Sequence, residues 1–306
     1  PGVIRDDLNR FLKPYNLFFG PNTSTSNRCM IGGMVGNNSS GTTSIKNGVT
    51  ADKVKEMKVL LSDGSETVFS EISAESFAEK LQLQTKEGDI YRSLYEELKP
   101  EKIQQQIRTG FPKPEIHRRN TGYAVDALIN SEIFSDSKEK LNICKLLCGS
   151  EGTLAFTTEI TLQLDPLPPK NAVMIAAHFD SVEKCLEAVV PAMRHSLFTC
   201  EMMDKTILDC TKNSLKYRDN RFFIEGDPAA ILMLEMRADD ELELTDKTAE
   251  LIKTLRESEL SYALPVLRND TIDLALELRK AGLGLLGNIV GDRKAVACIE
   301  DTAVAV

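Results

Sequence analysis

Several residue types that would define a class of protein are scarce or missing from this sequence. The chain of 306 residues has no tryptophan, only three histidines and 6% aromatic residues. No run approaches the roughly 18 apolar residues of a membrane helix, and the N-terminal residues show no signal-peptide pattern. The sequence therefore predicts no transmembrane segment.

Positive charge is also in the minority, because 37 Lys and Arg residues are set against 46 Asp and Glu residues, giving a net charge of −9. Nucleic acids and anionic membrane surfaces are bound by clustered Lys and Arg. We therefore expect no nucleic-acid partner, and we expect any anionic ligand to be held by local hydrogen-bond donors.

The residues that commonly bind metals do not form a recognisable set. The seven cysteines lie mostly in apolar contexts, which predicts reduced core residues of a cytoplasmic protein. Cys144 and Cys148 are four residues apart on an apolar helix face, but no second pair completes a four-ligand site. His178 lies in an apolar strand and is predicted to be a core residue, and His117 and His195 are predicted to lie on the surface. The sequence predicts no metal site.

Length and composition predict two domains. Hydrophobic residues make up 42% of the chain, and single cores stop growing near ~250–300 residues. The proline cluster at 165–169 lacks amide donors and resists helix formation, so we expect one domain over 1–168 and a second over 169–306. Both ends of the sequence look cut, which predicts a fragment of a longer polypeptide.

The first domain is predicted to consist largely of strands and loops. In KEMKVLLSDGSETVF, apolar residues alternate on either side of Asp63-Gly64, which predicts a hairpin with positive φ at both turn residues. Helices are expected at 74–83, 89–98 and 141–147, and β structure at 152–164.

In the second domain, strands are expected to alternate with helices. Predicted strands lie at 172–179 and 229–238, and three helices should begin and end at recognisable capping residues. These helices are 181–195 with Asp180 or Ser181 as N-cap, 246–258 with Thr245 as N-cap, and 270–281 ending at Gly282. The predicted fold class is α+β.

Two glycine patterns resemble nucleotide-binding motifs but lack the required context. Gly282, Gly284 and Gly287 match G-x-G-x-x-G, yet a helix precedes them, whereas a dinucleotide fold places this motif after a strand. Gly36 and Gly41 have P-loop spacing, but Thr42 stands where the phosphate-binding lysine should be. Neither a Rossmann fold nor nucleotide hydrolysis is predicted.

Residues 31–48, IGGMVGNNSSGTTSIKNG, contain neither a carboxylate nor an aromatic ring. We interpret them as a loop whose glycines let backbone amides approach an anion or a flat ring, with Asn and Ser side chains as further uncharged donors. An ordinary polar surface loop is the alternative.

This loop belongs to a series of motifs that resembles a known family. GPNTSTSN precedes it, the LLSDGSETVF hairpin follows it, and NTGY at 120–123 and GSEGTLAFTTEI at 149–160 come later. In this order they resemble the FAD-binding domain of the vanillyl-alcohol-oxidase (PCMH-type) flavoproteins. The resemblance is greatest to the D-2-hydroxy-acid dehydrogenases, which act on glycolate, D-lactate or D-2-hydroxyglutarate, and it is clearer over 1–165 than over 170–306.

The resemblance implies a fold and an FAD site. It implies the second subdomain of a PCMH-type FAD-binding domain, followed by part of a ferredoxin-like α+β cap domain. Segments 21–26, 32–41 and 149–154 should lie against each other along the FAD, since charge-assisted hydrogen bonds to its pyrophosphate contribute ~1.5–3 kcal/mol each. The cofactor-binding residues implied are Pro21, Thr23, Ser24, Thr25, Ser26, Gly32, Gly33, Asn37, Asn38, Ser39, Ser40, Gly41, Glu151, Gly152, Thr153 and Leu154.

The resemblance also implies a substrate residue. Arg279 occupies the position of an arginine that grips the substrate carboxylate, a role suited to its planar fork, although a cation in the last turn of a helix also complements the helix dipole. Two positions depart from the family pattern: Leu276 stands where tryptophan is common, and Asn47 where tyrosine is usual.

Other polar residues are left with open roles. Arg118 and Arg119 belong to a solvated basic loop, or one of them faces the flavin or the substrate. Asn120, Thr121 and Gly122 are interpreted as a turn that supports the flavin site. Glu201 and Asp204 match a cap-domain motif and are predicted to be structural.

The implied activity is oxidation of a D-2-hydroxy acid to the 2-oxo acid, with FAD as cofactor and a separate protein or quinone as electron acceptor. The catalytic base is expected beyond residue 306, and association of identical chains is left open. Two alternatives are a non-catalytic flavin-binding scaffold and a transferase like alkyl-dihydroxyacetone-phosphate synthase.

Overall fold

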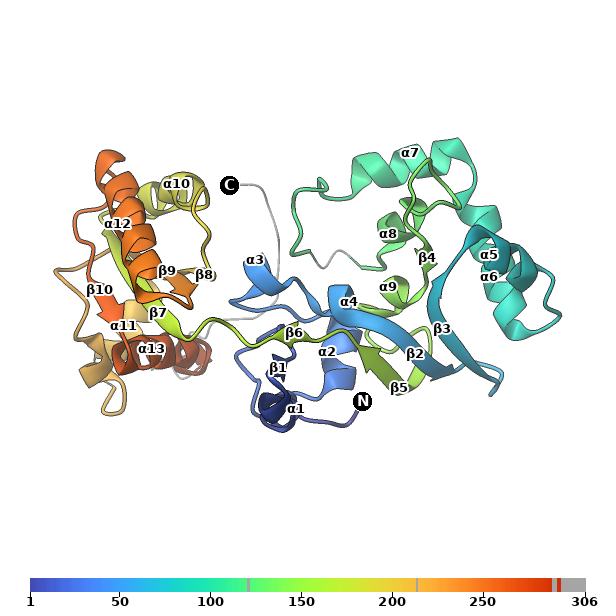
Figure 1. Cartoon of the computed structure of the whole chain (residues 1–306), viewed down its shortest axis with the longest axis horizontal. Helices are drawn as coiled ribbons and strands as arrows, with labels where there is room; N and C mark the ends of the chain where they lie inside the picture. The colour runs from blue at the N-terminus through green and yellow to red at the C-terminus, as the bar shows by residue number, and fades with distance from the viewer. Residues whose placement is uncertain (120–121, 213, 288–290, 293–306) are drawn as a thin grey trace. The chain divides into compact units, whose positions relative to one another are not determined.

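The computed structural model describes residues 1–119, 122–212, 214–287 and 291–292. The described chain forms two compact units, one over residues 1–167 and one that begins at Pro168, and Figure 1 shows the elements of each. Each unit combines an antiparallel sheet with helices, so the predicted α+β class is confirmed.

Unit 1 is built on a four-stranded antiparallel sheet in the order β4-β3-β2-β5. Its strands are β2 (Val54–Leu60), β3 (Glu66–Ile72), β4 (Leu141–Asn142) and β5 (Phe156–Leu162), and β1 (Leu17–Phe18) pairs separately with β6 (Asp165–Pro166). The helical segments are α1 (Arg5–Leu12), η1 (Lys13–Tyr15), α2 (Ile31–Asn37), α3 (Ser44–Asn47), α4 (Thr50–Lys53), α5 (Ala74–Leu81), α6 (Lys86–Leu98), α7 (Glu101–Gly110), α8 (Val125–Ile129) and α9 (Cys144–Leu147).

The core of unit 1 lies between the sheet and these helices. Val59 and Met57 of β2 and Phe69 of β3 are almost fully buried, and the ring of Tyr91 meets Phe69 and Phe77 edge-on. Cys144 and Cys148 belong to the same core, which confirms their predicted packing role. Burial raises the pKa of the Cys144 thiol to about 12, so this thiol stays protonated and unreactive at neutral pH.

The predicted hairpin of β2 and β3 is confirmed, but its turn differs from the prediction. Only Gly64 has positive φ, at 83°. The Leu61 amide donates to the Ser65 carbonyl, and Asp63 Oδ1 accepts from both the amide and the hydroxyl of Ser65. This is a three-residue connection with glycine at the left-handed position rather than a two-residue turn.

The helix predicted at 141–147 is wrong in its first half. Leu141 and Asn142 form β4 and pair with Ile72 and Glu71 of β3, and α9 begins only at Cys144. Pairing with a strand about 70 residues earlier overrides the local helical pattern, because the sheet edge supplies backbone partners that the sequence alone does not reveal.

Unit 2 is a four-stranded antiparallel sheet in the order β10-β7-β9-β8. Its elements are β7 (Asn171–Phe179), α10 (Val182–Ala192), β8 (Thr199–Asp204), α11 (Lys205–Lys212), η2 (Arg218–Arg221), β9 (Ala230–Ala238), α12 (Glu241–Glu257), β10 (Val266–Arg268) and α13 (Asp270–Gly287). Counted along the chain, the strand order is 4-1-3-2 with a helix after the first and third strands. This is the split βαβ topology of the ferredoxin-like fold that was predicted.

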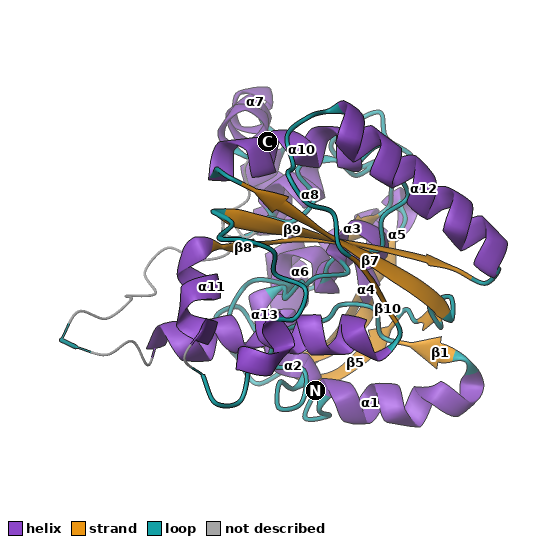
Figure 2. Ribbon diagram, turned by 90° about the vertical axis from the view of Figure 1, so that its left-hand side faces the viewer, coloured by secondary structure: helices purple, strands orange, loops and turns teal. Residues whose placement is uncertain are grey.

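Two helical layers cover the two faces of this sheet (Figure 2). On one face, α10 and α12 pack against alternating residues such as Ile175 and Leu234. On the other, α11 and α13 pack against Met174, Met233 and their neighbours. Because both faces are covered, β7 and β9 are continuous apolar runs with little alternation of burial.

In unit 2, α10 and α12 each follow a residue whose side chain accepts a hydrogen bond from a backbone amide of the first turn. Of the two candidate N-caps for α10, Ser181 is the one that acts, since its hydroxyl accepts from the Lys184 amide. Asp240, rather than Thr245, caps α12 by accepting from the Glu243 amide. Helix α13 does not end at Gly282. A Cβ there would lie 3.0 Å from Ile207 of α11, so this glycine allows two helices to approach and does not act as a C-cap.

Within the described ranges, no helix combines the length and the apolar character that a membrane span requires. The glycines at 282–287 lie inside α13, which agrees with the rejection of a dinucleotide motif.

His178 is a buried residue of β7 with both ring nitrogens engaged. Its Nδ1 lies 2.7 Å from the carbonyl oxygen of Ala176, and its Nε2 accepts from the Glu225 amide at 3.1 Å. This pair of partners requires the neutral ring protonated at Nδ1. Burial, as the main cause, lowers the pKa of His178 from its usual 6.5, so the predicted core role is confirmed.

Protonation of His178 should make the free energy of unfolding depend on pH. Because its pKa is lower in the folded than in the unfolded chain, its contribution is present above about pH 6.5 and is lost as the pH falls. His178→Gln keeps a donor and an acceptor but cannot be protonated. Urea unfolding of the whole chain at pH 7.5 and pH 5 should show a smaller loss of stability for the variant, and an equal loss in both proteins would contradict this assignment.

Candidate functional site

The first predicted site segment is helical where a loop was expected. Residues 31–37 form α2, and its Met34 and Val35 are buried in the core of unit 1. Asn38 ends the helix with φ at 51°. The glycine-rich composition misled the prediction because the short helix is held by tertiary packing of its apolar side chains and not by helix propensity.

The two glycines of α2 differ in their surroundings. The Gly32 amide donates to the carbonyl oxygen of Pro1 at 2.8 Å, and a Cβ at Gly32 would lie 2.7 Å from the Pro1 ring. This amide therefore has a backbone acceptor within the described chain, and its predicted contact with FAD stays a prediction. A Cβ at Gly33, by contrast, would meet no atom within 4 Å, so Gly33 faces open space.

The second predicted segment, 21–26, crosses the turn that follows α2. A Cβ at Gly41 would lie 1.4 Å from the carbonyl oxygen of Asn22, so only glycine allows these backbones to cross. The Thr43 hydroxyl donates to the Gly20 carbonyl at 2.9 Å. Asn47, which replaces the family tyrosine, packs against Gly20 on the same side.

The third segment, 149–154, is bonded directly to α2. The Gly149 amide donates to the Val35 carbonyl at 3.0 Å, and the Glu151 amide donates to the Gly36 carbonyl at 2.8 Å. A side-chain hydrogen bond of 3.1 Å joins Asn37 Nδ2 to Glu151 Oε1. The expected contact between these two segments is therefore confirmed.

Segments 21–26, 37–41 and 151–154 together form what we call the cradle. Its donors are backbone amides, hydroxyls and the carboxamides of Asn22, Asn37 and Asn38, and the amides of Gly41 and Gly152 donate to no other described residue. Its single carboxylate, Glu151, is occupied by Asn37. This uncharged donor set fits the pyrophosphate and the polar ring edges of FAD, which accept hydrogen bonds.

Some predicted residues of the cradle have local structural partners. Asn38 Oδ1 accepts from the Ala51 amide, so this side chain orients α4. The Thr23 hydroxyl lies 3.3 Å from both the Thr25 hydroxyl and the Cys29 sulfur, and the Ser26 hydroxyl donates to Asp6. Contact between the cradle residues and FAD stays a prediction.

Two residues that position the cradle were missed by the sequence analysis. Arg5 of α1 donates from Nε to the Pro21 carbonyl and from Nη2 to the Phe19 carbonyl. The Tyr123 hydroxyl lies 2.7 Å from the Thr153 hydroxyl. Neither contact has a signal in the sequence, because the partners are backbone carbonyls or a hydroxyl far along the chain.

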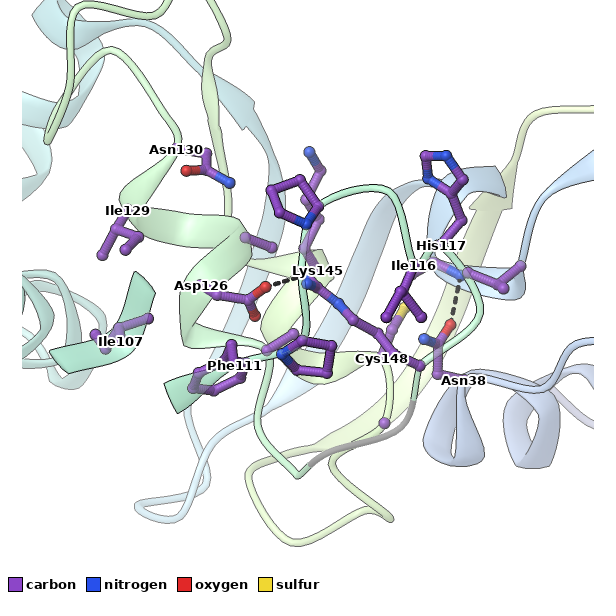
Figure 3. Close-up of a pocket in the computed structure, with 18 of the residues that line it drawn as sticks. Asn38, Ile107, Phe111, Ile116, His117, Asp126, Ile129, Asn130, Lys145 and Cys148 are labelled. Carbon is purple, nitrogen blue, oxygen red and sulfur yellow. Dashed lines mark hydrogen bonds and ion pairs between the residues drawn. The ribbon is translucent and has the colours of Figure 1, made fainter. Parts of the chain in front are cut away.

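A cavity of about 480 Å³ lies beside the cradle in unit 1, where Asn38 and Gly149 form part of its lining. Figure 3 shows Phe111 and Asp126 toward one side of it and His117 toward the other. Asp126 pairs with Arg119 through Oδ2, while its buried Oδ1 has no hydrogen-bond partner among the described residues. Arg119 is therefore bound to a carboxylate of its own unit.

Other residues of the basic loop are only partly described. Asn120 and Thr121 lie outside the described residues, so their turn stays a prediction. Gly122 has φ at 89°, which is compatible with a turn. Among the described residues, no group of three or more His, Cys, Asp or Glu side chains is arranged to hold a metal ion.

Arg279 lies in unit 2, on α13, where it forms an ion pair with Glu201 of β8. The predicted substrate arginine is thus already held by a carboxylate. Asp204, the other acidic residue of that motif, accepts from the Ile207 amide at the start of α11, which is the structural role expected. His195 Nε2 lies 2.9 Å from the Thr254 hydroxyl.

Two families of known protein domains match separate stretches of the chain. Residues 1–70 match the FAD binding domain family, and residues 168–306 match the C-terminal domain of FAD linked oxidases. The chain therefore has the two domains of FAD-linked oxidases, and these domains match those of the PCMH-type FAD family.

The chain is also similar to individual proteins with named activities. The chain is 30% identical over 315 residues to a D-2-hydroxyglutarate dehydrogenase of Pantoea ananatis, and 30% identical over 314 residues to one of Escherichia coli (strain K12). Both matches cover 99% of this chain but only 30% of the relative. Glycolate oxidase subunit GlcD of Escherichia coli (strain K12) is 25% identical over 242 residues, 77% of this chain and 34% of the relative.

A solved alkyldihydroxyacetonephosphate synthase has a similar fold. Its TM-score is 0.55 at 10% identity, and the match covers 94% of this chain and 44% of that protein. At this identity the likeness shows a shared fold alone.

Gly33 offers a direct test of the cradle. Gly33→Ala should leave stability unchanged or raise it by about 0.5–1 kcal/mol, because alanine favours helix over glycine. If FAD lies along α2, the added methyl group occupies its space and should lower FAD affinity by about tenfold or more in the full-length protein. Flavin fluorescence titration with a parallel urea melt measures both effects.

Gly110→Ala is the matched control. Gly110 ends α7 in the same unit, and a Cβ there would also meet no atom within 4 Å. This variant should bind FAD with unchanged affinity. Equal FAD affinity in the Gly33 and Gly110 variants would contradict the placement of FAD along α2.

Proposed function

We propose that the full-length protein is an FAD-dependent dehydrogenase that oxidises a D-2-hydroxy acid to the 2-oxo acid. The single observation that carries this proposal is the convergence of the three cradle segments in unit 1, whose first 70 residues match the FAD binding domain family. The relatives named D-2-hydroxyglutarate dehydrogenase support the class of substrate. This chain spans about 30% of the length of those relatives, so the activity is proposed for the whole protein.

In this proposal the residues of unit 1 bind the cofactor. The amides of Gly41 and Gly152 and the hydroxyl of Ser40 would donate to FAD, and Gly33 would leave room for it. The hydroxyls of Ser39 and Thr153 donate to Asn37 Oδ1 and to the Ser150 carbonyl, so they would line the site without donating to FAD. Bound FAD supplies the acceptor for the hydride that leaves Cα of the substrate. Oxidation of an alcohol also requires a base for the hydroxyl proton, which we continue to expect beyond residue 306.

Unit 2 would contribute recognition of the substrate. Arg279 is the proposed partner of the substrate carboxylate, since a guanidinium can donate two parallel hydrogen bonds to it. The unit has the ferredoxin-like topology expected of a cap domain and matches the C-terminal domain of FAD linked oxidases.

The electron acceptor, the cellular location and self-association are further parts of the proposal. Electrons would pass to a separate acceptor, either a protein or a quinone. The unpaired thiols of the six described cysteines support a reducing, cytoplasmic location. Self-association stays a prediction.

Anaerobic reduction of the flavin tests the proposed reaction. The oxidised flavin absorbance of the full-length protein should bleach on addition of D-2-hydroxyglutarate, D-lactate or glycolate, and stay unchanged with L-2-hydroxyglutarate. A protein that binds FAD but is bleached by none of these acids would instead be a scaffold or a transferase without net oxidation.

A further inference from the structure

Glu201 is a carboxylate on a largely apolar sheet face. It lies on the edge strand β8, opposite Met233 of β9. Since side chains alternate along a strand, Glu201 is on the same face as Met203, which packs in the cluster covered by α11 and α13. Its side chain is only 12% exposed.

The partner of Glu201 is rigidly placed. Arg279 follows Leu278, a fully buried residue of α13, and the preceding turn is anchored by Ala275, which is also fully buried. One turn later, Gly282 brings α13 against Ile207 of α11. The backbone of Arg279 is therefore fixed, and the bond from Nη2 to Glu201 Oε2 also fixes the end of its long side chain.

The guanidinium keeps unused donors. Within the described residues, only Nη2 of Arg279 is engaged, and Nε and Nη1 donate to no other residue. The side chain is 26% exposed. Nη2 also carries a second N–H, and together with the N–H of Nε or Nη1 beside it this forms an edge of the planar fork that can bind a carboxylate through two hydrogen bonds.

A second ion pair on the same sheet face, between Glu235 and Arg237, differs from the pair of Glu201 and Arg279 in how many of its polar groups have partners. Glu235 is buried, and its two oxygens accept from Arg237 Nε and the Thr199 hydroxyl. Arg237 also donates from Nη1 to the Pro169 carbonyl and lies over the Phe198 ring. That pair is closed by partners on both sides, whereas the pair of Glu201 and Arg279 leaves donors available.

Stability alone gives a weak reason for the pair of Glu201 and Arg279. Removing two charges from water costs about as much as their attraction returns, and apolar residues of similar volume are often as stable. Positioning a donor group for an incoming anion is a role that an apolar pair cannot fill.

We propose that Glu201 is a positioning residue that holds the Arg279 guanidinium in the orientation needed to receive the carboxylate of the substrate. This inference rests on the proposed function, in which Arg279 binds that carboxylate. Glu201 itself touches neither the substrate nor the cofactor, so its effect should appear in substrate affinity and act only through Arg279.

Steady-state kinetics of the full-length protein with D-2-hydroxyglutarate test this role. Glu201→Gln keeps the shape and an acceptor oxygen but removes the charge. It should raise KM by about tenfold or more, equivalent to ~1.4 kcal/mol, with a much smaller change in kcat. Glu201→Asp should retain part of the affinity, because it restores the charge on a shorter side chain.

The matched control is Glu235→Gln, which breaks the other ion pair of the same face. It should lower thermal stability while leaving KM unchanged. An unchanged KM in Glu201→Gln, or an equal rise in KM in both variants, would overturn the positioning role.

A double-mutant cycle separates positioning from general damage. In an Arg279→Met background, Glu201→Gln should weaken 2-oxoglutarate binding no further, as read from the flavin spectrum. A full additional loss of affinity in that background would also overturn the role. If the unaltered protein binds FAD but reacts with no 2-hydroxy acid, the proposed function itself fails, whereas turnover with an unchanged KM in Glu201→Gln rejects only the role of Glu201.

Discussion

Two backbone hydrogen bonds, from the amides of Gly149 and Glu151 to the carbonyls of Val35 and Gly36, hold the candidate site together. They join segments separated by more than 110 residues, and the bond between Asn37 and Glu151 spans 114 positions. The carbonyls in the last turn of a helix lack donors from a following turn, and within the described chain the Val35 carbonyl otherwise accepts only from the C-cap amide of Asn38. The turn at 149–154 supplies those partners and thereby determines where the cradle lies.

Small residues make this contact possible. Gly36 lies close to the backbone of Glu151, and Gly41 leaves no room for a Cβ beside Asn22. Positive φ at Glu151 and Gly152 turns the chain so that the Gly152 amide is left without a partner among the described residues. The same constraints that pack the segments therefore leave uncharged donors available for a ligand.

In unit 2 the proposed ligand-binding group is a charged side chain, Arg279, and not a set of backbone amides. Its sheet is buried on both faces, so a charged side chain on either face must have a partner. Arg279 meets this requirement through Glu201 and still retains donors. Binding of FAD by a cradle of amides and binding of a carboxylate by an oriented guanidinium are complementary tasks, and the two units supply one each in the proposed enzyme.

The amino-acid sequence by itself determined the fold class, the hairpin of β2 and β3, the presence of α10 and the burial of His178, because each depends on local periodicity, turn chemistry or composition. It also identified the motifs that carry the family resemblance. Only the tertiary structure decided that 31–37 is a helix, that 141–142 is a strand, that Gly282 packs between helices and that Arg279 is paired with Glu201. Each of these depends on a partner far along the chain, and local sequence contains no record of which distant backbone or side chain will meet it.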